Sequence, residues 1–170
     1  MIVTKRKELR YIDQFYDAMI KVNLDDLKKI GDKLTECKGI VYLIGNGGSC
    51  AIASHAAVDL QPCRAIAISD SALLTRAAND FGWENAPTNP LIYLVTKKDI
   101  LIAISSSGQS ANIINAVHNA NRWGAFVITF TGFNSDNPLK QLGNINIWVD
   151  SKDYGIVESA HTLLFHMIGK

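Results

Sequence analysis

Apolar residues along this chain of 170 residues fall into short continuous runs, separated by segments in which they return every three or four positions. Each run is rich in β-branched residues, and continuous apolar runs are typical of strands buried on both faces of a parallel sheet. Strands that alternate with helical segments indicate crossover units. We therefore predict an α/β fold with helices on both faces of a parallel sheet, its strands at residues 39–45, 64–69, 99–105, 125–132 and 145–150.

Helical spacing dominates both ends of the chain. Residues 13–37 are predicted to form two helices that meet near Val22–Leu24, with Asn23 capping the second. Residues 154–170 are predicted to form a terminal helix. Residues 90–96 fit either a strand or a helix, and we favour the helix.

The composition restricts the class of protein. Hydrophobic residues make up 48% of the chain and the mean hydropathy is +0.08. We expect a single domain over residues 1–170. Because the chain is apolar for its size, we also expect part of its apolar surface to be covered in a homo-oligomer. The net charge is only +1 and the Lys and Arg residues are scattered along the chain, so we expect no nucleic-acid partner. We also expect no membrane span and no signal peptide.

Three cysteines, Cys37, Cys50 and Cys63, are present without a CxxC pair. An odd number of cysteines argues against a disulfide framework. We therefore expect a reduced, cytoplasmic protein.

A glycine-rich turn follows the first predicted strand, in the sequence GNGGSC of residues 45–50. Gly47 and Gly48 let a ligand approach the backbone, and the N–H groups at the start of a helix attract an anion. Asn46 and Ser49 add side-chain donors. The plainer alternative is a tight turn in which Ser49 caps the helix.

The same turn half-matches the dinucleotide-binding fingerprint G-x-G-x-x-G. Asp70 follows the next strand, where a ribose-binding acid would lie. Cys50, however, stands in place of the third glycine, so we expect no nucleotide cofactor. A P-loop is excluded because no Gly-Lys-Ser/Thr follows either glycine-containing turn.

A second polar turn follows the third predicted strand and leads into another helix. It carries Ser105, Ser106, Ser107 and Ser110 around Gly108. Four hydroxyl groups and several amides at the start of a helix would saturate the oxygens of a phosphomonoester without Arg or Lys. Because turn and capping chemistry explains only one or two of these serines, the sequence predicts a phosphate site here, at the carboxyl ends of the strands.

Candidate acid, base and metal-ligating groups lie on two helical segments. His55 and Asp59 are four residues apart and share a helical face. On the terminal helix, His166 lies roughly 80° round from Glu158 and His161 about 60° round on the other side, so the two histidines diverge. Two imidazoles and two carboxylates would suit Zn²⁺, and without a metal they offer an acid and a base near neutral pH.

Each histidine also has a purely structural interpretation. His118 is most simply a surface or interface residue, and His161 a satisfied residue of the core or of a subunit contact. The pair of His55 and Asp59 would also be stable as a solvated helical pair. His166 lies four residues from the end of the chain, where fraying would weaken a catalytic role.

Together these motifs resemble the sugar isomerase (SIS) domain family. The resemblance rests on GNGGS with the His-x-x-x-acid pair, on AIAISDSALLTRAANDFG, on DILIAISSSGQSANIINAVHNANRWG and on FVITFTG. It covers about residues 25–167. The serine turn is specific to SIS domains, and NDFG with the terminal histidine pair is similar to the phosphoheptose isomerase branch.

The resemblance implies a three-layer αβα sandwich with a five-stranded sheet, a homotetramer with active sites shared between subunits, and residues 1–38 as N-terminal helices used in subunit packing. It implies isomerisation of a phosphosugar between aldose and ketose through a cis-enediol, for lipopolysaccharide or capsule heptose synthesis. By position, the implied groups are the phosphate ligands Ser49, Ser105, Ser106, Ser107 and Ser110, the substrate-binding Asn46, Gly47, Asp80 and Glu158, the catalytic Asp59 and His166, and the Zn²⁺ ligands His55, Asp59, Glu158 and His166.

Three positions depart from the family pattern. Asp59 stands where the family usually has Glu, and Glu158 where it usually has Gln. The connection to the second strand is shorter than usual and lacks the arginine-bearing loop, which leaves open whether Arg64 replaces that arginine. These departures keep a second hypothesis open, a non-catalytic SIS module that binds a phosphosugar or a protein partner of the replication-initiator type.

Overall fold

The predicted strands form one five-stranded parallel sheet in the order β2-β1-β3-β4-β5. The computed structural model describes residues 2–61 and 63–168. The α/β class and the parallel sheet are therefore confirmed. The strands are β1 (Val41–Gly45), β2 (Ala65–Ala67), β3 (Ile100–Ser105), β4 (Phe126–Thr131) and β5 (Ile145–Trp148).

Helices connect the strands and precede them. The second helix begins after Asn23, whose side chain accepts a hydrogen bond from Asp25 N, as predicted. Residues 90–94 are helical, which confirms the preferred interpretation of that segment. The elements are α1 (Ile2–Met19), α2 (Leu24–Glu36), α3 (Gly47–Asp59), α4 (Ser71–Phe81), η1 (Trp83–Asn85), α5 (Thr88–Leu94), α6 (Ala111–Arg122), η2 (Leu139–Gln141) and α7 (Tyr154–Met167).

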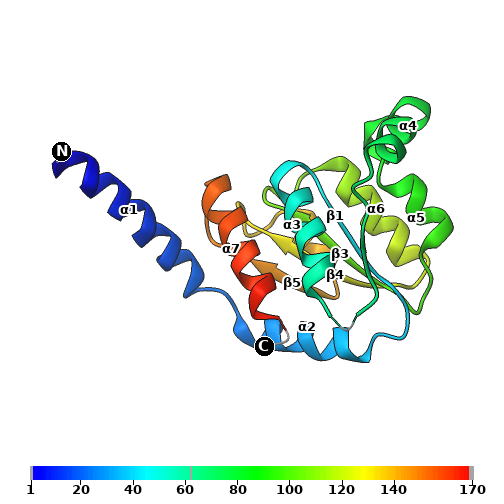
Figure 1. Ribbon diagram of the computed structural model, residues 1–170, viewed down its shortest axis with the longest axis horizontal. Helices are drawn as coiled ribbons and strands as arrows, with labels where there is room; N and C mark the ends of the chain where they lie inside the picture. Colours follow the sequence, from blue (N-terminus) through cyan, green and yellow to red (C-terminus); the bar gives the residue numbers. More distant parts are fainter. Residues whose placement is uncertain (1, 62, 169–170) are drawn as a thin grey trace.

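Two apolar cores lie on opposite faces of the sheet. Leu43, Ile102 and Ile128 pack with residues of α2, α3 and α7, whereas the alternate strand residues Leu101 and Val127 pack with α5 and α6. Successive strand residues point to opposite faces. Because both faces of the sheet are buried, each strand needs a continuous apolar run. The sheet with helices on both faces forms a three-layer αβα sandwich (Figure 1).

The two N-terminal helices differ in how they pack. α2 buries Leu27, Ile30 and Leu34 in the core and belongs to the sandwich itself. Most of α1 projects from the body of the molecule (Figure 1), and it leaves Ile12 and Tyr16 more than half exposed. None of the helices in the described part of the chain is both long and apolar enough to cross a membrane.

The strand order fixes where a ligand binds. From β1 the chain crosses to β2 on one side and later returns to β3 on the other, so the order reverses between β1 and β3. Ligands of open α/β sheets bind in the crevice at the carboxyl ends of the strands at such a point. Both polar turns found in the sequence, after β1 and after β3, lie there.

Candidate active site

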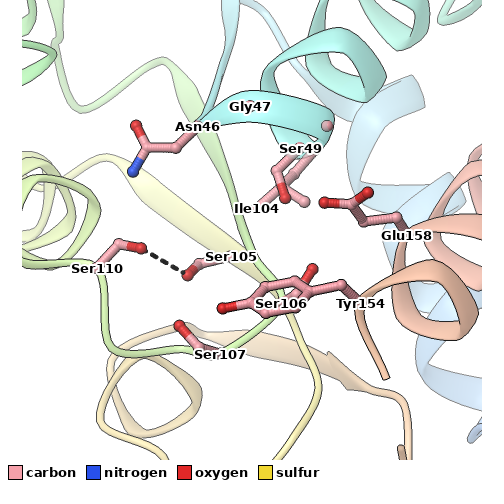
Figure 2. A pocket seen from close by; sticks show the side chains of 11 residues that line it. Asn46, Gly47, Ser49, Ile104, Ser105, Ser106, Ser107, Ser110, Tyr154 and Glu158 are labelled. Atoms are coloured by element: carbon pink, nitrogen blue, oxygen red, sulfur yellow. Dashed lines mark hydrogen bonds between the residues drawn. The ribbon is translucent and has the colours of Figure 1, made fainter. Parts of the chain in front are cut away.

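A cavity of about 250 Å³ lies between the turn after β1 and the turn after β3. We call it the serine pocket (Figure 2). Of the predicted substrate-binding residues, all but Asp80 line it. Its lining consists of Asn46, Gly47, Gly48, Ser49, Ile104, Ser105, Ser106, Ser107, Ser110, Tyr154 and Glu158.

The turn after β1 is shaped by its glycines. Gly47 begins α3 with a φ of 52°, in the left-handed region that favours glycine. A side chain at Gly48 would collide with the carboxylate of Glu158. The helix cap is Asn46 rather than Ser49, so the alternative that assigned the cap to Ser49 is wrong; Ser49 lies buried in the first turn of α3, facing the pocket.

Asn46 makes no capping hydrogen bond because its side chain is held elsewhere. Its Nδ2 donates to Asn112 Oδ1 at 2.9 Å, and Asn112 Nδ2 donates back to Asn46 Oδ1 at 2.8 Å. This reciprocal amide pair joins the β1 turn to the first turn of α6. It fixes the orientation of the Asn46 amide and leaves one N–H and one lone pair free for a ligand.

The turn after β3 presents its hydroxyl groups to the cavity. Ser105 Oγ donates to Ser110 Oγ at 3.2 Å, and Ser107 Oγ accepts from Gln109 N at 3.2 Å. Ser106 is only 4% exposed, and its Oγ has no hydrogen-bond partner among the described residues. Because buried hydroxyl groups are nearly always paired, the Ser106 hydroxyl points to a polar ligand in the pocket.

Neither Lys nor Arg is among the lining residues of the pocket. The groups that it offers to an anion are hydroxyl groups, backbone N–H groups and the amino ends of α3 and α6. Glu158 adds a single carboxylate on the side of α7 (Figure 2).

His55, Asp59 and His166 meet on the facing surfaces of α3 and α7, and we call them the histidine cluster. Asp59 Oδ2 lies 3.1 Å from His55 Nε2 and 3.1 Å from His166 Nδ1. The two imidazole rings pack edge to face, with centroids 5.2 Å apart. The cluster borders a second cavity of about 530 Å³.

The histidine cluster has the donor set of a zinc site. One ligand atom from each residue lies within 4.8 Å of the other two, and two imidazoles with one carboxylate suit a catalytic Zn²⁺ that keeps a further position open. Glu158 is not part of this group; it lines the serine pocket. Its assignment as a further ligand stays a prediction.

The serine pocket and the histidine cluster lie along the same two helices. His55 follows Ser49 by six residues on α3, which is a rise of about 9 Å. His166 follows Glu158 by eight residues on α7, a rise of about 12 Å. A ligand held at the pocket therefore reaches the cluster only if it is an extended chain.

The two histidines of α7 diverge, as their spacing predicts. His161 is fully buried, with Nε2 3.2 Å from Thr131 O and its ring edge-on to Phe130. Burial lowers the pKa of His161 to about 4, so the ring is neutral at pH 7. His161 is therefore a core residue, as predicted, although only Nε2 is satisfied, because Nδ1 has no hydrogen-bond partner among the described residues. His118 is exposed on α6.

Three other candidate ligand-binding residues named from the sequence lie away from the serine pocket. Asp80, on α4, pairs with Arg76 at 2.9 Å and does not line the cavity. Asp70, the residue considered for ribose binding, caps α4 by accepting from Leu73 N at 2.8 Å. Arg64 directly precedes β2, at the amino end of that strand, and does not line the serine pocket of its own chain; whether it replaces the missing arginine stays open.

Two polar residues of the site, Asn112 and Tyr154, were not predicted from the sequence. Asn112 has a detectable signal, because it is the one polar residue among the buried positions of α6. Tyr154 has none, since nothing in the sequence shows that the start of α7 faces the serine turn.

Known proteins share this sequence and this fold. The profile of the SIS domain family matches residues 9–132. A probable phosphoheptose isomerase of Thermoplasma acidophilum is 31% identical over 173 residues, covering 94% of this chain and 93% of that protein. A phosphoheptose isomerase of Leptospira biflexa is 35% identical over 159 residues, covering 87% and 77%.

A solved structure agrees. The phosphoheptose isomerase of Neisseria gonorrhoeae superposes with a TM-score of 0.89 at 25% identity, covering 98% of this chain and 97% of that one. The chain therefore belongs to the SIS domain family, in its phosphoheptose isomerase branch.

Proposed function

We propose that this protein is a phosphosugar isomerase that interconverts sedoheptulose 7-phosphate and D-glycero-D-manno-heptose 7-phosphate. The observation that carries the proposal is the arrangement of one phosphate-binding pocket and one acid–base cluster along the same pair of helices. A seven-carbon sugar with a terminal phosphate suits this separation, because its phosphate and its carbonyl lie at opposite ends. The named relatives support the same substrate.

The phosphate would bind at the serine pocket. Ser106 Oγ, which has no hydrogen-bond partner among the described residues, and the hydroxyl groups of Ser105, Ser107 and Ser110 would donate to its oxygens. Ser49 and the backbone at Gly47 would add donors from the amino end of α3. Asn46 would donate its free N–H to a sugar hydroxyl.

The chemical step would use the histidine cluster. Asp59 takes a proton from C1 of the ketose, which leaves a cis-enediol, and returns a proton to C2. His166 moves the proton between the two oxygens, from O1 to O2. No atom is gained or lost, as isomerisation requires.

His55, Asp59 and His166 are also the groups that would hold Zn²⁺, with Glu158 as the proposed further ligand. When bound there, the ion would polarise the sugar carbonyl as a Lewis acid.

We further propose a cytoplasmic homotetramer whose active sites are shared between subunits and whose product feeds lipopolysaccharide or capsule heptose synthesis. The exposed apolar residues of α1 support subunit packing, among them Ile12 and Tyr16. A shared site would also give Asp80, which lies away from its own chain's pocket, a sugar to contact in a neighbouring subunit.

One observation favours a second candidate, a non-catalytic module that binds a phosphosugar or a protein partner. Both histidines of the cluster are engaged by the short side chain of Asp59, an arrangement that is stable without any substrate. In that case the serine pocket would bind and the cluster would do no chemistry.

NMR of sedoheptulose 7-phosphate with the protein, with and without Zn²⁺, separates the two candidates. We expect conversion to an aldose phosphate, abolished by Asp59→Asn and by His166→Ala. Chemical-shift changes without conversion, unaltered by either substitution, would contradict the isomerase and support the binding module.

A further inference from the structure

We propose that the ring of Tyr154 is a specificity-determining wall of the serine pocket, which selects a phosphate carried on a carbon chain over free inorganic phosphate. The inference rests on the proposed function, because it concerns the same phosphosugar in the same pocket.

Tyr154 supplies apolar surface that the pocket otherwise almost lacks. Apart from Ile104, the other lining residues are polar or glycine. Figure 2 shows the ring of Tyr154 reaching from α7 toward the serine turn. The residue is 58% exposed, so a large part of its surface is available to a ligand.

A strained neighbour holds this ring in place. The rings of Tyr154 and Phe133 pack at an interplanar angle of 60°, with centroids 4.8 Å apart. Phe133 has a φ of 55° and is the one non-glycine residue with positive φ in the described part of the chain. For a bulky residue this conformation is unfavourable, and strain of this kind is concentrated at functional sites.

The backbone on both sides of the aromatic pair is anchored. Phe133 N donates to Ser151 O at 2.8 Å, which ties the end of β4 to the segment before α7. Asp153 Oδ1 caps α7 by accepting from Ile156 N at 3.0 Å and also accepts from Tyr11 Oη at 2.8 Å. Tyr154 therefore begins a fixed first turn and not a loose end.

The chemistry of the ligand explains what such a wall selects. A sugar phosphate presents C–H groups next to its phosphate, and these pack favourably against an aromatic face. Inorganic phosphate is polar on every side and gains nothing from the ring. The serine turn would bind the phosphate of either ligand, whereas the ring of Tyr154 would contribute only to binding of the sugar phosphate, beside the polar contacts that the sugar makes elsewhere in the site.

The test compares two dissociation constants, for sedoheptulose 7-phosphate and for inorganic phosphate, both measured by calorimetry on the full-length protein. For Tyr154→Ala we expect binding of the sugar phosphate to weaken about tenfold and that of inorganic phosphate to change less than about threefold. Tyr154→Phe keeps the ring and should bind both ligands like the wild type. Tyr93→Ala is the matched control, since Tyr93 is 81% exposed on α5 and does not line the pocket.

Phe133→Gly provides a second variant that should fold, because glycine adopts the observed φ without strain. It should weaken binding of the sugar phosphate in the same direction as Tyr154→Ala, by a smaller factor. Sedimentation of each variant shows whether its assembly is intact.

Three results would overturn the inference: equal weakening of both ligands by Tyr154→Ala, no weakening of either, or weakening that accompanies a changed assembly, which would make the ring a subunit contact. The outcome is separate from that of the isomerase proposal. If the wild type binds sedoheptulose 7-phosphate without converting it, the isomerase is wrong while the ratio of the two constants still decides the role of Tyr154.

Discussion

In the serine pocket three of the five serine hydroxyl groups lie at the end of strand β3 or on the two residues that follow it, whereas in the histidine cluster every functional atom stands at the end of a side chain on a helix surface. Ser105 ends β3, pairs in register with β4 through Thr131, and is 5% exposed. The side chains of His55, Asp59 and His166 are 61%, 36% and 42% exposed.

The difference separates binding from chemistry. The sheet fixes the backbone of the pocket, so losing one hydroxyl group there leaves the other donors in position. The cluster depends on side-chain length and charge, and a displacement of about 1 Å at a reacting group changes rates about a hundredfold. Substitutions in the cluster should therefore act on kcat and those in the pocket on KM.

The largest effect is expected for Asp59→Asn, which keeps the shape of the side chain but removes its basicity. We expect kcat to fall about 10²- to 10⁴-fold with KM nearly unchanged, because an amide cannot accept a proton from carbon. Initial rates of sedoheptulose 7-phosphate conversion measure this. Asp59→Glu, the residue usual in the family, is the control and should retain turnover. An Asp59→Asn protein with the wild-type kcat would contradict the assignment of chemistry to the histidine cluster and of binding to the serine pocket.

His161 allows a buried side chain to be compared with an exposed one on the same helix, because it lies in the core five residues before His166. Its folded pKa of about 4 is below the ordinary value of 6.5, so between these values the unfolded state binds more protons. The neutral ring thus contributes stability that is complete above pH 6.5 and is lost as the pH falls toward 4. The loss amounts to about 3 kcal/mol.

Urea unfolding at pH 7.5 and pH 4.5 measures this loss, with His161→Leu as the matched variant. Leucine leaves Thr131 O paired, because that carbonyl also accepts from Val149 N at 2.9 Å. The free energy of unfolding of His161→Leu should fall less between the two pH values than that of the wild type. Equal falls would show that His161 is not the group responsible.

Gly108→Ala tests whether the backbone builds the pocket. Gly108 has a φ of 65°, and a Cβ there would collide with the Asn137 side chain, which is held by Gly132 O, Asn134 O and Lys140 N. We expect a loss of about 1–3 kcal/mol in the free energy of unfolding together with a raised KM. Gly124→Ala is the control, because Gly124 also has a positive φ, of 77°, but a Cβ there would meet only the Cβ of Lys97, at 3.5 Å. Equal KM values for the two variants would contradict a backbone-built pocket.

Sequence patterns predicted the parts of the molecule that depend on local spacing. The strands, the cap at Asn23 and the serine turn all follow from residues close together in the chain. The divergence of His161 from His166 follows from the helical repeat alone.

What spacing within a single helix or strand could not predict depends on neighbours far apart in the chain. Glu158 and His166 share a helix, but Glu158 faces Gly48 and the serine pocket while His166 faces Asp59. Spacing within α7 does not distinguish these two environments, because they are determined by which residues of α3 pack against each part of α7. The pairing of Asn46 with Asn112 likewise spans 66 positions.

The smallest effect is expected for that pair. Asn112→Ala removes both amide hydrogen bonds to Asn46, which is then free to rotate and must be ordered again when the sugar binds. We expect KM to rise about fivefold, because ordering the Asn46 side chain again costs about 1 kcal/mol of binding free energy, and kcat to stay near the wild-type value because Asp59 and His166 are untouched.

A double-mutant cycle with Asn46→Ala decides whether Asn112 acts through Asn46. If Asn112 only positions Asn46, KM of the double variant should equal that of Asn46→Ala alone, because Asn112 then has nothing left to orient. Additive changes in KM would mean instead that Asn112 supports the pocket independently of Asn46, through the packing of α6 against β3. The first turn of α6 would then belong to the backbone framework of the site.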